Sequence, residues 1–283
     1  MTRILTIFTL LFATPAWALS LDDVVERDGH IYKKFSQELF TGKLDEGAQQ
    51  GEVINGEMVG EWAIFNEDGQ LFGKGKFEEN KATGTWEIYN NEGNLYNTGD
   101  FKEGFKVGLW KSYRKNGKLF SEKLFKNGIE VKRTSFHENG EVWERSAGDE
   151  NGWQGEYLVF WDNGKLRTRS FYKDGKKNGV SNDFHIDGAL RFKGDFVAGE
   201  ENGMHIRYFI DGGVENQGVW DNGKKIGEHL EFYENGQLGK KILFLNDEET
   251  SAEYYDEKGN NISSSEYAWA TLNRIRAMLD AAK

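Results

Sequence analysis

The sequence contains no cysteine and a single proline, Pro15, among its 283 residues. The absence of cysteine excludes disulfides, thiolate metal sites and a lipid anchor attached through cysteine. Glycine, by contrast, occurs 35 times, and aromatic residues make up 14% of the chain. Large aromatic side chains argue against disorder, and frequent glycine argues against a helix-rich fold. The composition is typical of a many-stranded sheet with glycine-marked turns.

Positive charge is also in short supply, since the net charge at pH 7 is −11. An acidic chain repels phosphate backbones, so the charge argues against nucleic-acid binding. Adsorption to anionic lipid headgroups is disfavoured for the same reason. Long apolar runs are scarce as well, and we expect no transmembrane segment.

The first 18 residues have the pattern of a secretory signal peptide. Arg3 provides the positive start, residues 4–13 form a short apolar core, and Ala16-Trp17-Ala18 fits the small-x-small cleavage pattern. We therefore expect an exported protein, periplasmic or secreted, whose mature chain starts near Leu19.

A repeat of 23 or 24 residues organises most of the chain. Taking Gly60 as the first position, the pattern restarts at Gly84, Gly108, Val131, Gly155, Gly179, Gly203, Gly227 and, in truncated form, Thr250. Five residues after each start lies an aromatic residue, in the column Phe65, Tyr89, Tyr113, Phe136, Phe160, Phe184, Tyr208, Phe232 and Tyr255. Nine residues after each start lies a glycine, and two residues later in eight of the units an aliphatic residue, such as Leu71.

Each unit has the sequence of a β-hairpin. An aromatic strand leads into a polar turn such as Asn66-Glu67-Asp68-Gly69, where glycine supplies the positive φ that the turn requires. A lone hairpin is marginally stable in water, so each unit must pack against its neighbours. The sequence predicts an all-β fold, an elongated antiparallel meander of about nine hairpins with a short C-terminal capping helix.

These units resemble the MORN repeat in its bacterial variant. Gly84-Thr85-Trp86-Glu87-Ile88-Tyr89 and Gly108-Leu109-Trp110-Lys111-Ser112-Tyr113 carry the resemblance, together with the lead-in from Val25 to Gly42, which is similar to that of YwqK-type proteins. The resemblance covers roughly residues 22–262 and implies a protein-binding or scaffolding module. The YwqK-type group is often labelled as antitoxins, which implies a cytoplasmic partner, whereas this chain has an export signal. The antitoxin role that is compatible with export is immunity against a toxin that acts in the periplasm.

The two ends of the repeat array differ from its middle. We expect residues 19–59 to form a lead-in and a degraded repeat that cover the first edge, residues 60–262 to hold the regular hairpins, and residues 263–283 to form the helix. Ser263-Ser264-Ser265-Glu266 fits a capping box. Leu272, Ile275, Leu279 and Ala282 fall on one helix face, which we expect to pack over the last hairpin.

Alternation along the strands predicts two faces for the sheet. The aromatic column and the leucine column should share the core face, and a second set of aromatic residues should lie opposite. This candidate binding face consists of Trp62, Phe72, Trp86, Tyr96, Trp110, Phe120 and Trp143. In later units the equivalent second-strand residues are polar, namely Arg167, Arg191, Glu215 and Gly239. An exposed aromatic face would bind a protein, a peptide or a glycan; alternatively, strand bulges turn these rings into the core.

Other chemistry has weaker support. His205 and His229 occupy equivalent positions and could form a metal pair, but no third ligand repeats beside them, so we expect surface histidines and no metal. No phosphate loop, Gly-x-Ser-x-Gly elbow or His-Glu-x-x-His motif is present, and we expect neither catalytic residues nor a cofactor. Three hypotheses remain, in order: a scaffold that binds a protein partner, a module that binds cell-envelope glycan, and a hydrolase with a dispersed carboxylate pair.

Overall fold

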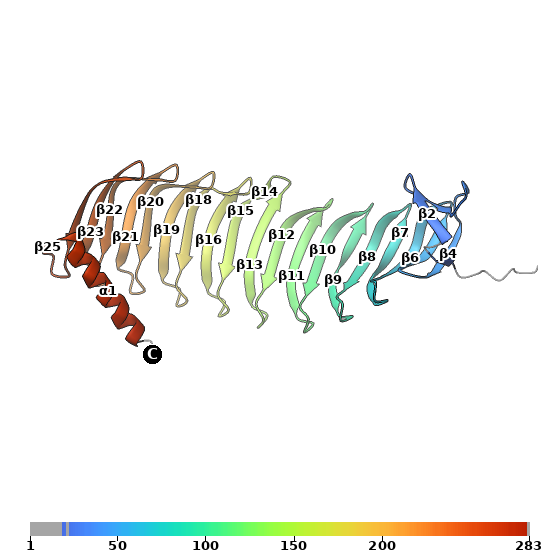
Figure 1. Cartoon of the computed structure of the whole chain (residues 1–283), viewed down its shortest axis with the longest axis horizontal. Coiled ribbons are helices and arrows are strands. Elements are labelled where there is room, and N and C mark those ends of the chain that lie inside the picture. The colour runs from blue at the N-terminus through green and yellow to red at the C-terminus, as the bar shows by residue number, and fades with distance from the viewer. Residues whose placement is uncertain (1–18, 21–22, 282–283) are drawn as a thin grey trace, which may run out of the picture. The chain divides into compact units, whose positions relative to one another are not determined.

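The computed structural model describes residues 19–20 and 23–281, and the chain divides into two compact units. The N-terminal unit comprises residues 1–106 and the C-terminal unit residues 107–283. Within each unit, consecutive strands form an antiparallel meander, as Figure 1 shows. The expected signal peptide, residues 1–18, lies outside the described residues.

The N-terminal unit builds a sheet of hairpins and a separate small hairpin. Its strands are β1 (Leu19–Ser20), β2 (Val24–Arg27), β3 (His30–Lys33), β4 (Gly42–Glu46), β5 (Gln49–Ile54), β6 (Glu57–Phe65), β7 (Leu71–Glu78), β8 (Lys81–Tyr89) and β9 (Leu95–Lys102). Strands β4 to β9 pair antiparallel in sequence order. Strand β1 pairs parallel with β4 at Leu19 and Ser20, so it covers part of the first edge of this sheet.

A buried cluster joins the separate β2–β3 hairpin to the sheet. Val24 of β2 packs with Phe40, Leu44, Val53 and Trp62, and of these five the most exposed, Val24, retains only 7% of its surface. The lead-in segment therefore has an apolar core of its own, continuous with the first regular hairpin.

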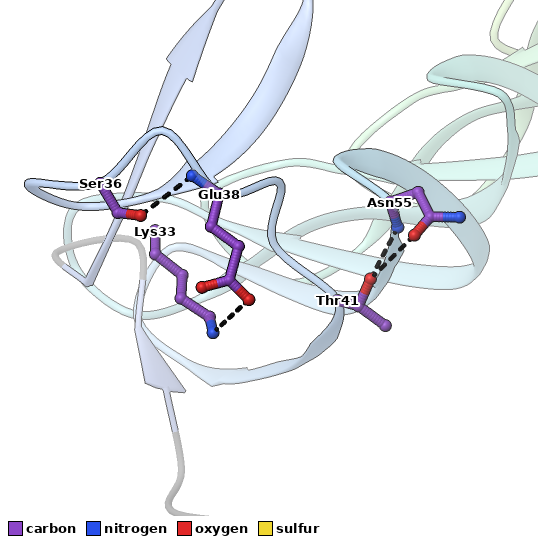
Figure 2. A network of polar contacts seen from close by, with 5 residues as sticks. All are labelled: Lys33, Ser36, Glu38, Thr41 and Asn55. Carbon is purple, nitrogen blue, oxygen red and sulfur yellow. Dashed lines mark hydrogen bonds and ion pairs between the residues drawn. The ribbon is translucent and has the colours of Figure 1, made fainter.

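Polar contacts fasten the loops of this lead-in, as Figure 2 shows. Lys33 forms an ion pair with Glu38 at 3.0 Å, and the backbone N–H of Glu38 donates to Ser36 Oγ. The backbone N–H of Asn55 donates to Thr41 Oγ1 at 2.8 Å. These side chains are exposed, so they order the connections at the cap but contribute little stability individually.

The C-terminal unit continues the same architecture and ends in a helix. Its elements are β10 (Phe105–Tyr113, which begins just before the unit boundary), β11 (Leu119–Lys126), β12 (Ile129–Phe136), β13 (Val142–Asp149), β14 (Gly152–Trp153), β15 (Gly155–Phe160), β16 (Leu166–Lys173), β17 (Lys176–Lys177), β18 (Gly179–Phe184), β19 (Leu190–Val197), β20 (Glu200–Tyr208), β21 (Val214–Asp221), β22 (Lys224–Phe232), β23 (Leu238–Leu245), β24 (Glu248–Tyr255), β25 (Asn261–Ile262) and α1 (Ser264–Ala281). The all-β prediction with one C-terminal helix is confirmed.

The repeated turn glycine behaves as the sequence predicts. Gly93 and Gly236 have φ values of 79° and 82°, in the left-handed region that favours glycine. Each turn is closed by a backbone hydrogen bond three residues back, for example from Gly93 N–H to the Asn90 carbonyl at 2.9 Å. The asparagine side chain adds a second closure, because Asn90 Oδ1 accepts from the backbone N–H of Glu92.

The buried face of the sheet is the opposite of the one we expected. The aromatic and leucine columns do share a face, since Tyr89 pairs directly with Leu95. That face is the polar one, because Tyr89 Oη donates to Glu87 Oε2 at 2.6 Å and Glu87 pairs with Lys74 at 2.8 Å. All nine residues of the aromatic column are only half-buried. The core lies on the other face, which carries the tryptophans.

Helix α1 begins as predicted but packs through a different face. Ser263 and Glu266 form the capping box: Ser263 N–H donates to Glu266 Oε2 at 2.8 Å, and Glu266 N–H donates to Ser263 Oγ at 3.3 Å. Tyr267 and Arg274 contact the ring of Tyr233, so these two residues hold the helix against the sheet. The face expected to pack there is instead exposed, with Leu272 and Ile275 at 49% and Leu279 at 61%, while Ala282 lies outside the described residues. In Figure 1 the helix starts beside β25 and its far end extends clear of the strands.

Candidate binding surface

The three tryptophans of the expected aromatic face are core residues. Trp62, Trp86 and Trp110 retain 2%, 6% and 3% of their surface. Each of the first two rings lies flat against a glycine of the preceding strand, since a Cβ on Gly51 or Gly75 would come within 2.3 Å of the indole. A buried ring cannot contact a partner, so for these three tryptophans the alternative holds, in which the rings belong to the core, and they are not part of an exposed binding face.

The four second-strand aromatics of the same expected face are exposed, because each lies at a β-bulge. In the N-terminal unit, Ile64 pairs with Gly73 and Phe65 with Leu71, which leaves Phe72 without a pairing partner. Tyr96 is skipped in the same way. An extra residue at a bulge re-aims its side chain. Phe72 and Tyr96 accordingly expose 49% and 51% of their surface.

The C-terminal unit repeats this bulge in successive hairpins. At each one the residue just before the turn pairs with the residue just after it, and the next pairing skips one position on the second strand. The skipped residues are Phe120, Trp143, Arg167, Arg191, Glu215 and Gly239, which we call the bulge row. Phe120 and Trp143 are each 37% exposed, and the next two members, both arginines, are also exposed.

A side chain from across the hairpin turn supports each of the first three row positions. Arg114 Cζ lies 4.7 Å from the centre of the Phe120 ring. The rings of His137 and Trp143 are 6.5 Å apart. At the third position the roles are reversed, and Arg167 Cζ lies 4.6 Å from the Trp161 ring. At each of these three positions an aromatic ring therefore contacts a guanidinium group or an imidazole ring.

The supporting residues are themselves anchored to the next hairpin. Arg114 Nη2 donates to the Phe136 carbonyl at 2.6 Å. His137 Nε2 lies 2.9 Å from the Phe160 carbonyl, which makes it the donor of this hydrogen bond. These hydrogen bonds fix the supporting side chains in place, so the exposed rings of the bulge row lie on a pre-ordered surface.

The bulge row ends beneath the C-terminal helix. Its last member, Gly239, is buried, and a Cβ there would come within 3.0 Å of the Tyr233 ring. Tyr233 is 4% exposed and lies against Tyr267 and Arg274 of α1. Burial raises the pKa of Tyr267 to about 12, so this phenol is neutral at physiological pH. The accessible part of the row therefore comprises the members from Phe120 to Arg191, with Glu215 half-buried beyond them.

The two repeat histidines are buried and do not form a metal site. His205 is 3% exposed and His229 is 8% exposed, which corrects the expectation of surface histidines. They occupy the tryptophan position of their units, and Trp220 lies between their rings at 4.7 Å and 4.5 Å. Each Nε2 bonds a backbone carbonyl, that of Asp195 or Val219. Within residues 19–20 and 23–281, no cluster of three metal-ligating side chains occurs.

One ionic group replaces aromatic packing near the middle of the C-terminal unit. Arg133 occupies the tryptophan position of its unit and forms a two-pronged contact with Glu130 at 2.7 and 3.2 Å. Burial alone would raise the pKa of Glu130, but Arg133 and Lys123 together hold that pKa below its usual value. Glu144, which is 7% exposed, accepts from Ser146 Oγ at 3.3 Å. The arrangement is a satisfied ion-pair network within the sheet face.

Hollows large enough for a small molecule occur within each unit. In the N-terminal unit, a hollow of about 500 Å³ has Asp45, Glu52 and Glu61 in its lining, next to Lys43 and Lys74. In the C-terminal unit, a hollow of about 460 Å³ has Phe209, Tyr233 and Arg274 in its lining. The carboxylates of the first hollow are interleaved with lysines, and this mixture does not single out an acid–base pair.

Three segments match a protein-family model, that of the MORN repeat variant. The matched residues are 106–127, 153–174 and 225–246, and each match spans one strand–turn–strand hairpin. The matches support the MORN-repeat family. In this array, Trp62, Trp86 and Trp110 at the tryptophan position are buried, whereas the bulge row is exposed from Phe120 to Arg191.

Comparisons with complete proteins add little. A search of curated proteins finds no match. Among solved structures, the crystal structures of TcdB2-TccC3-Cdc42 and TcdB2-TccC3 align over 76% of this chain at 10% identity, with TM-scores of 0.21 and 0.20. The aligned parts make up 12% and 13% of those chains. At these TM-scores the likeness carries no argument about fold or function. In the described part of the chain, no helix has the length and apolarity needed to cross a bilayer.

Proposed function

We propose that this protein is an exported, non-catalytic scaffold that binds a protein partner through the bulge row of its C-terminal unit. The observation that carries the proposal is the exposure of Phe120 and Trp143 at 37% each, on rings held in place from across the turn. Isolated exposed rings are common, but two at equivalent bulges, followed by two exposed arginines, make an ordered surface.

The residue types of the row favour a protein partner. Tryptophan and arginine are the residues most enriched among those that dominate binding energy at protein interfaces. The ring faces and fixed positive charges of Trp143 and Arg167 bind other groups but do not transfer protons, which is why we propose a binding role rather than catalysis. Repeats of the MORN type suggest a binding module as well.

The proposal includes an immunity-like version, in which the partner is a toxin. Its support is the resemblance of the lead-in and the repeats to the antitoxin-labelled group, combined with the export pattern of residues 1–18. Under this version, the captured partner is toxic when expressed alone in the same compartment and harmless when co-expressed with this protein. A captured partner that is harmless alone leaves the scaffold role and removes the immunity version.

Affinity capture of the mature protein from envelope extract tests the proposal. We expect the wild-type chain to capture one stoichiometric protein and the variant Phe120→Ala with Trp143→Ala to recover at least about tenfold less of it, because truncating a residue that anchors an interface costs about 2 kcal/mol or more. Trp269→Ala is the matched control, since Trp269 is 61% exposed on α1 and is not a member of the row.

Each outcome of this capture has a defined meaning. Circular dichroism and thermal melting must show that the double variant is folded. Equal recovery by the folded double variant would remove the bulge row as the contact surface. If no protein is captured and the bait sediments with purified peptidoglycan, the exposed rings bind glycan and the protein-partner proposal fails.

A further inference from the structure

The spacing of the bulge row is set by the sheet itself. Phe120 lies on β11, Trp143 on β13, Arg167 on β16 and Arg191 on β19, and one strand separates each neighbouring pair. Strands in a sheet are about 4.7–4.9 Å apart, so neighbouring row positions repeat about every 9.5 Å. A linear partner that uses the row must present side chains at the same interval.

A polyproline II helix has this interval. It rises about 3.1 Å per residue with three residues per turn, so every third side chain falls on the same face about 9.3 Å further along. The mismatch with the row is about 0.2 Å per step and stays below about 1 Å over its four accessible positions.

The other regular backbones fit less well. In an extended strand, side chains on one face repeat about every 6.7 Å, and the residue three positions on points to the opposite face. In an α-helix, side chains seven residues apart repeat about every 10.5 Å, so the mismatch grows to about 3 Å over three steps. Aromatic-lined surfaces are also the surfaces that recognise proline-rich segments.

The order of side chains along the row gives the partner a charge pattern. Two rings, Phe120 and Trp143, are followed by two exposed guanidinium groups, those of Arg167 and Arg191. Arg167 stacks on Trp161, and Arg191 Nη2 lies 3.7 Å from Asp183 Oδ2, so both arginines are oriented at the surface. These guanidinium groups complement carboxylates on a partner.

We propose that the bulge row binds a polyproline II segment that has prolines at two positions three residues apart, followed at the same interval by two acidic residues. This inference rests on the proposed function and names the chemistry of the partner. Prolines would lie against the rings of Phe120 and Trp143, and carboxylates would pair with Arg167 and Arg191. The segment is preformed, so little conformational entropy is lost when it binds.

Titration with synthetic peptides tests the interval. The probe is a fluorescently labelled peptide with prolines at its first and fourth positions and glutamates at its seventh and tenth. The comparison peptide has the same composition with an interval of four. We expect the first peptide to bind the mature protein with a dissociation constant below about 1 mM and at least about tenfold more tightly than the second. Equal affinity for the two intervals would overturn the proposal.

A charge-reversed pair of proteins and peptides tests the assignment of the arginines. The variant Arg167→Glu with Arg191→Glu should lose about tenfold in affinity for the glutamate peptide and gain affinity for a peptide with lysines at the same positions. Phe120→Ala with Trp143→Ala should weaken binding of both the glutamate peptide and the lysine peptide. Trp269→Ala should leave the binding of both peptides unchanged. A folded charge-reversed variant that keeps its preference for the glutamate peptide would refute the assignment.

The two proposals can fail separately. If affinity capture yields a protein whose recovery depends on Phe120 and Trp143, but no interval-three peptide binds, the scaffold function stands and the polyproline II inference is wrong. If the peptides bind with the expected preference but no protein is captured, the inference that the bulge row binds a polyproline II segment is retained. The proposed scaffold function then fails.

Discussion

Replacing Gly75 by alanine tests how the sheet buries its tryptophans. A Cβ at this position would lie 2.3 Å from Cδ2, 2.4 Å from Cε2 and 2.5 Å from Cγ of Trp86. Carbon atoms prefer a separation of about 3.5–4.0 Å, so the ring or the strand must move by more than about 1 Å. The ring cannot slide freely, because Phe77 and Phe101 pack edge-on against it at 5.2 and 5.8 Å.

The expected cost of Gly75→Ala is therefore that of an overpacked core, about 1–3 kcal/mol. For a unit of this size, each kcal/mol lowers the midpoint of thermal unfolding by roughly 4–8 °C. Gly73→Ala on the same strand is the matched control, since a Cβ there would meet only the Glu87 carbonyl at 3.4 Å. We expect the control to change stability by less than about 1 kcal/mol.

Denaturation followed by tryptophan fluorescence, with thermal melting as a second probe, measures both variants. A loss in Gly75→Ala no larger than in Gly73→Ala would refute the packing argument. A second-site change sharpens the test, because the unit that starts at Gly155 has Tyr157 at the tryptophan position, and in the unit before it Ser146 occupies the position equivalent to Gly75. Gly75→Ser combined with Trp86→Tyr copies that pair, and we expect it to lose less than the sum of its single changes.

Two further predictions concern acid stability and the helix cap. Burial lowers the pKa of His229 below its ordinary value, so near pH 6 the unfolded chain binds more protons there than the folded chain, and stability falls as pH falls through the ordinary pKa. His229→Phe should flatten the decline of the urea midpoint between about pH 7.5 and about pH 5.5, and an unchanged slope would contradict this. Ser263→Ala removes the cap of α1 and should cost about 1 kcal/mol of local stability, seen as faster hydrogen exchange in residues 264–270 with no change in the strands. Equal exchange in both proteins would show that contacts with the sheet alone hold the first turn.

The hairpin meander could be predicted from the sequence because its signals are local. The turn glycines, such as Gly69 and Gly93, need a positive φ that few other residues adopt, and they recur at a fixed interval. The capping box at Ser263 is local for the same reason. Side-chain alternation also placed Trp86 and Tyr89 correctly on opposite faces.

The choice of the buried face failed, because it depends on contacts between units. Trp86 is buried because Gly75 of the preceding hairpin leaves room for an indole, and no single unit contains that information. The burial of His229 has the same cause, because its ring fills the space that the missing side chain of Gly218 leaves. The sequence does contain the signal, as a small residue in one unit followed by a ring in the next.

The candidate surface was predicted in part. Phe120 and Trp143 are exposed as the aromatic-face hypothesis requires, but the bulge that exposes them inserts one residue into the second strand, and a shift of one residue inverts the alternation from there on. The supporting residues Arg114 and His137 were missed. Each lies six residues before its partner in the row, across a turn, and that constant offset is the signal that finds them.

Site-specific photocrosslinking in living cells tests the central claim most directly. A photoreactive phenylalanine analogue replaces Trp143 in one strain and Trp269, which is more exposed, in another. We predict one crosslinked partner protein from position 143 and none from position 269. Crosslinks from position 269 alone, or none from position 143 in a folded and correctly exported protein, would contradict the assignment of the bulge row as the binding surface.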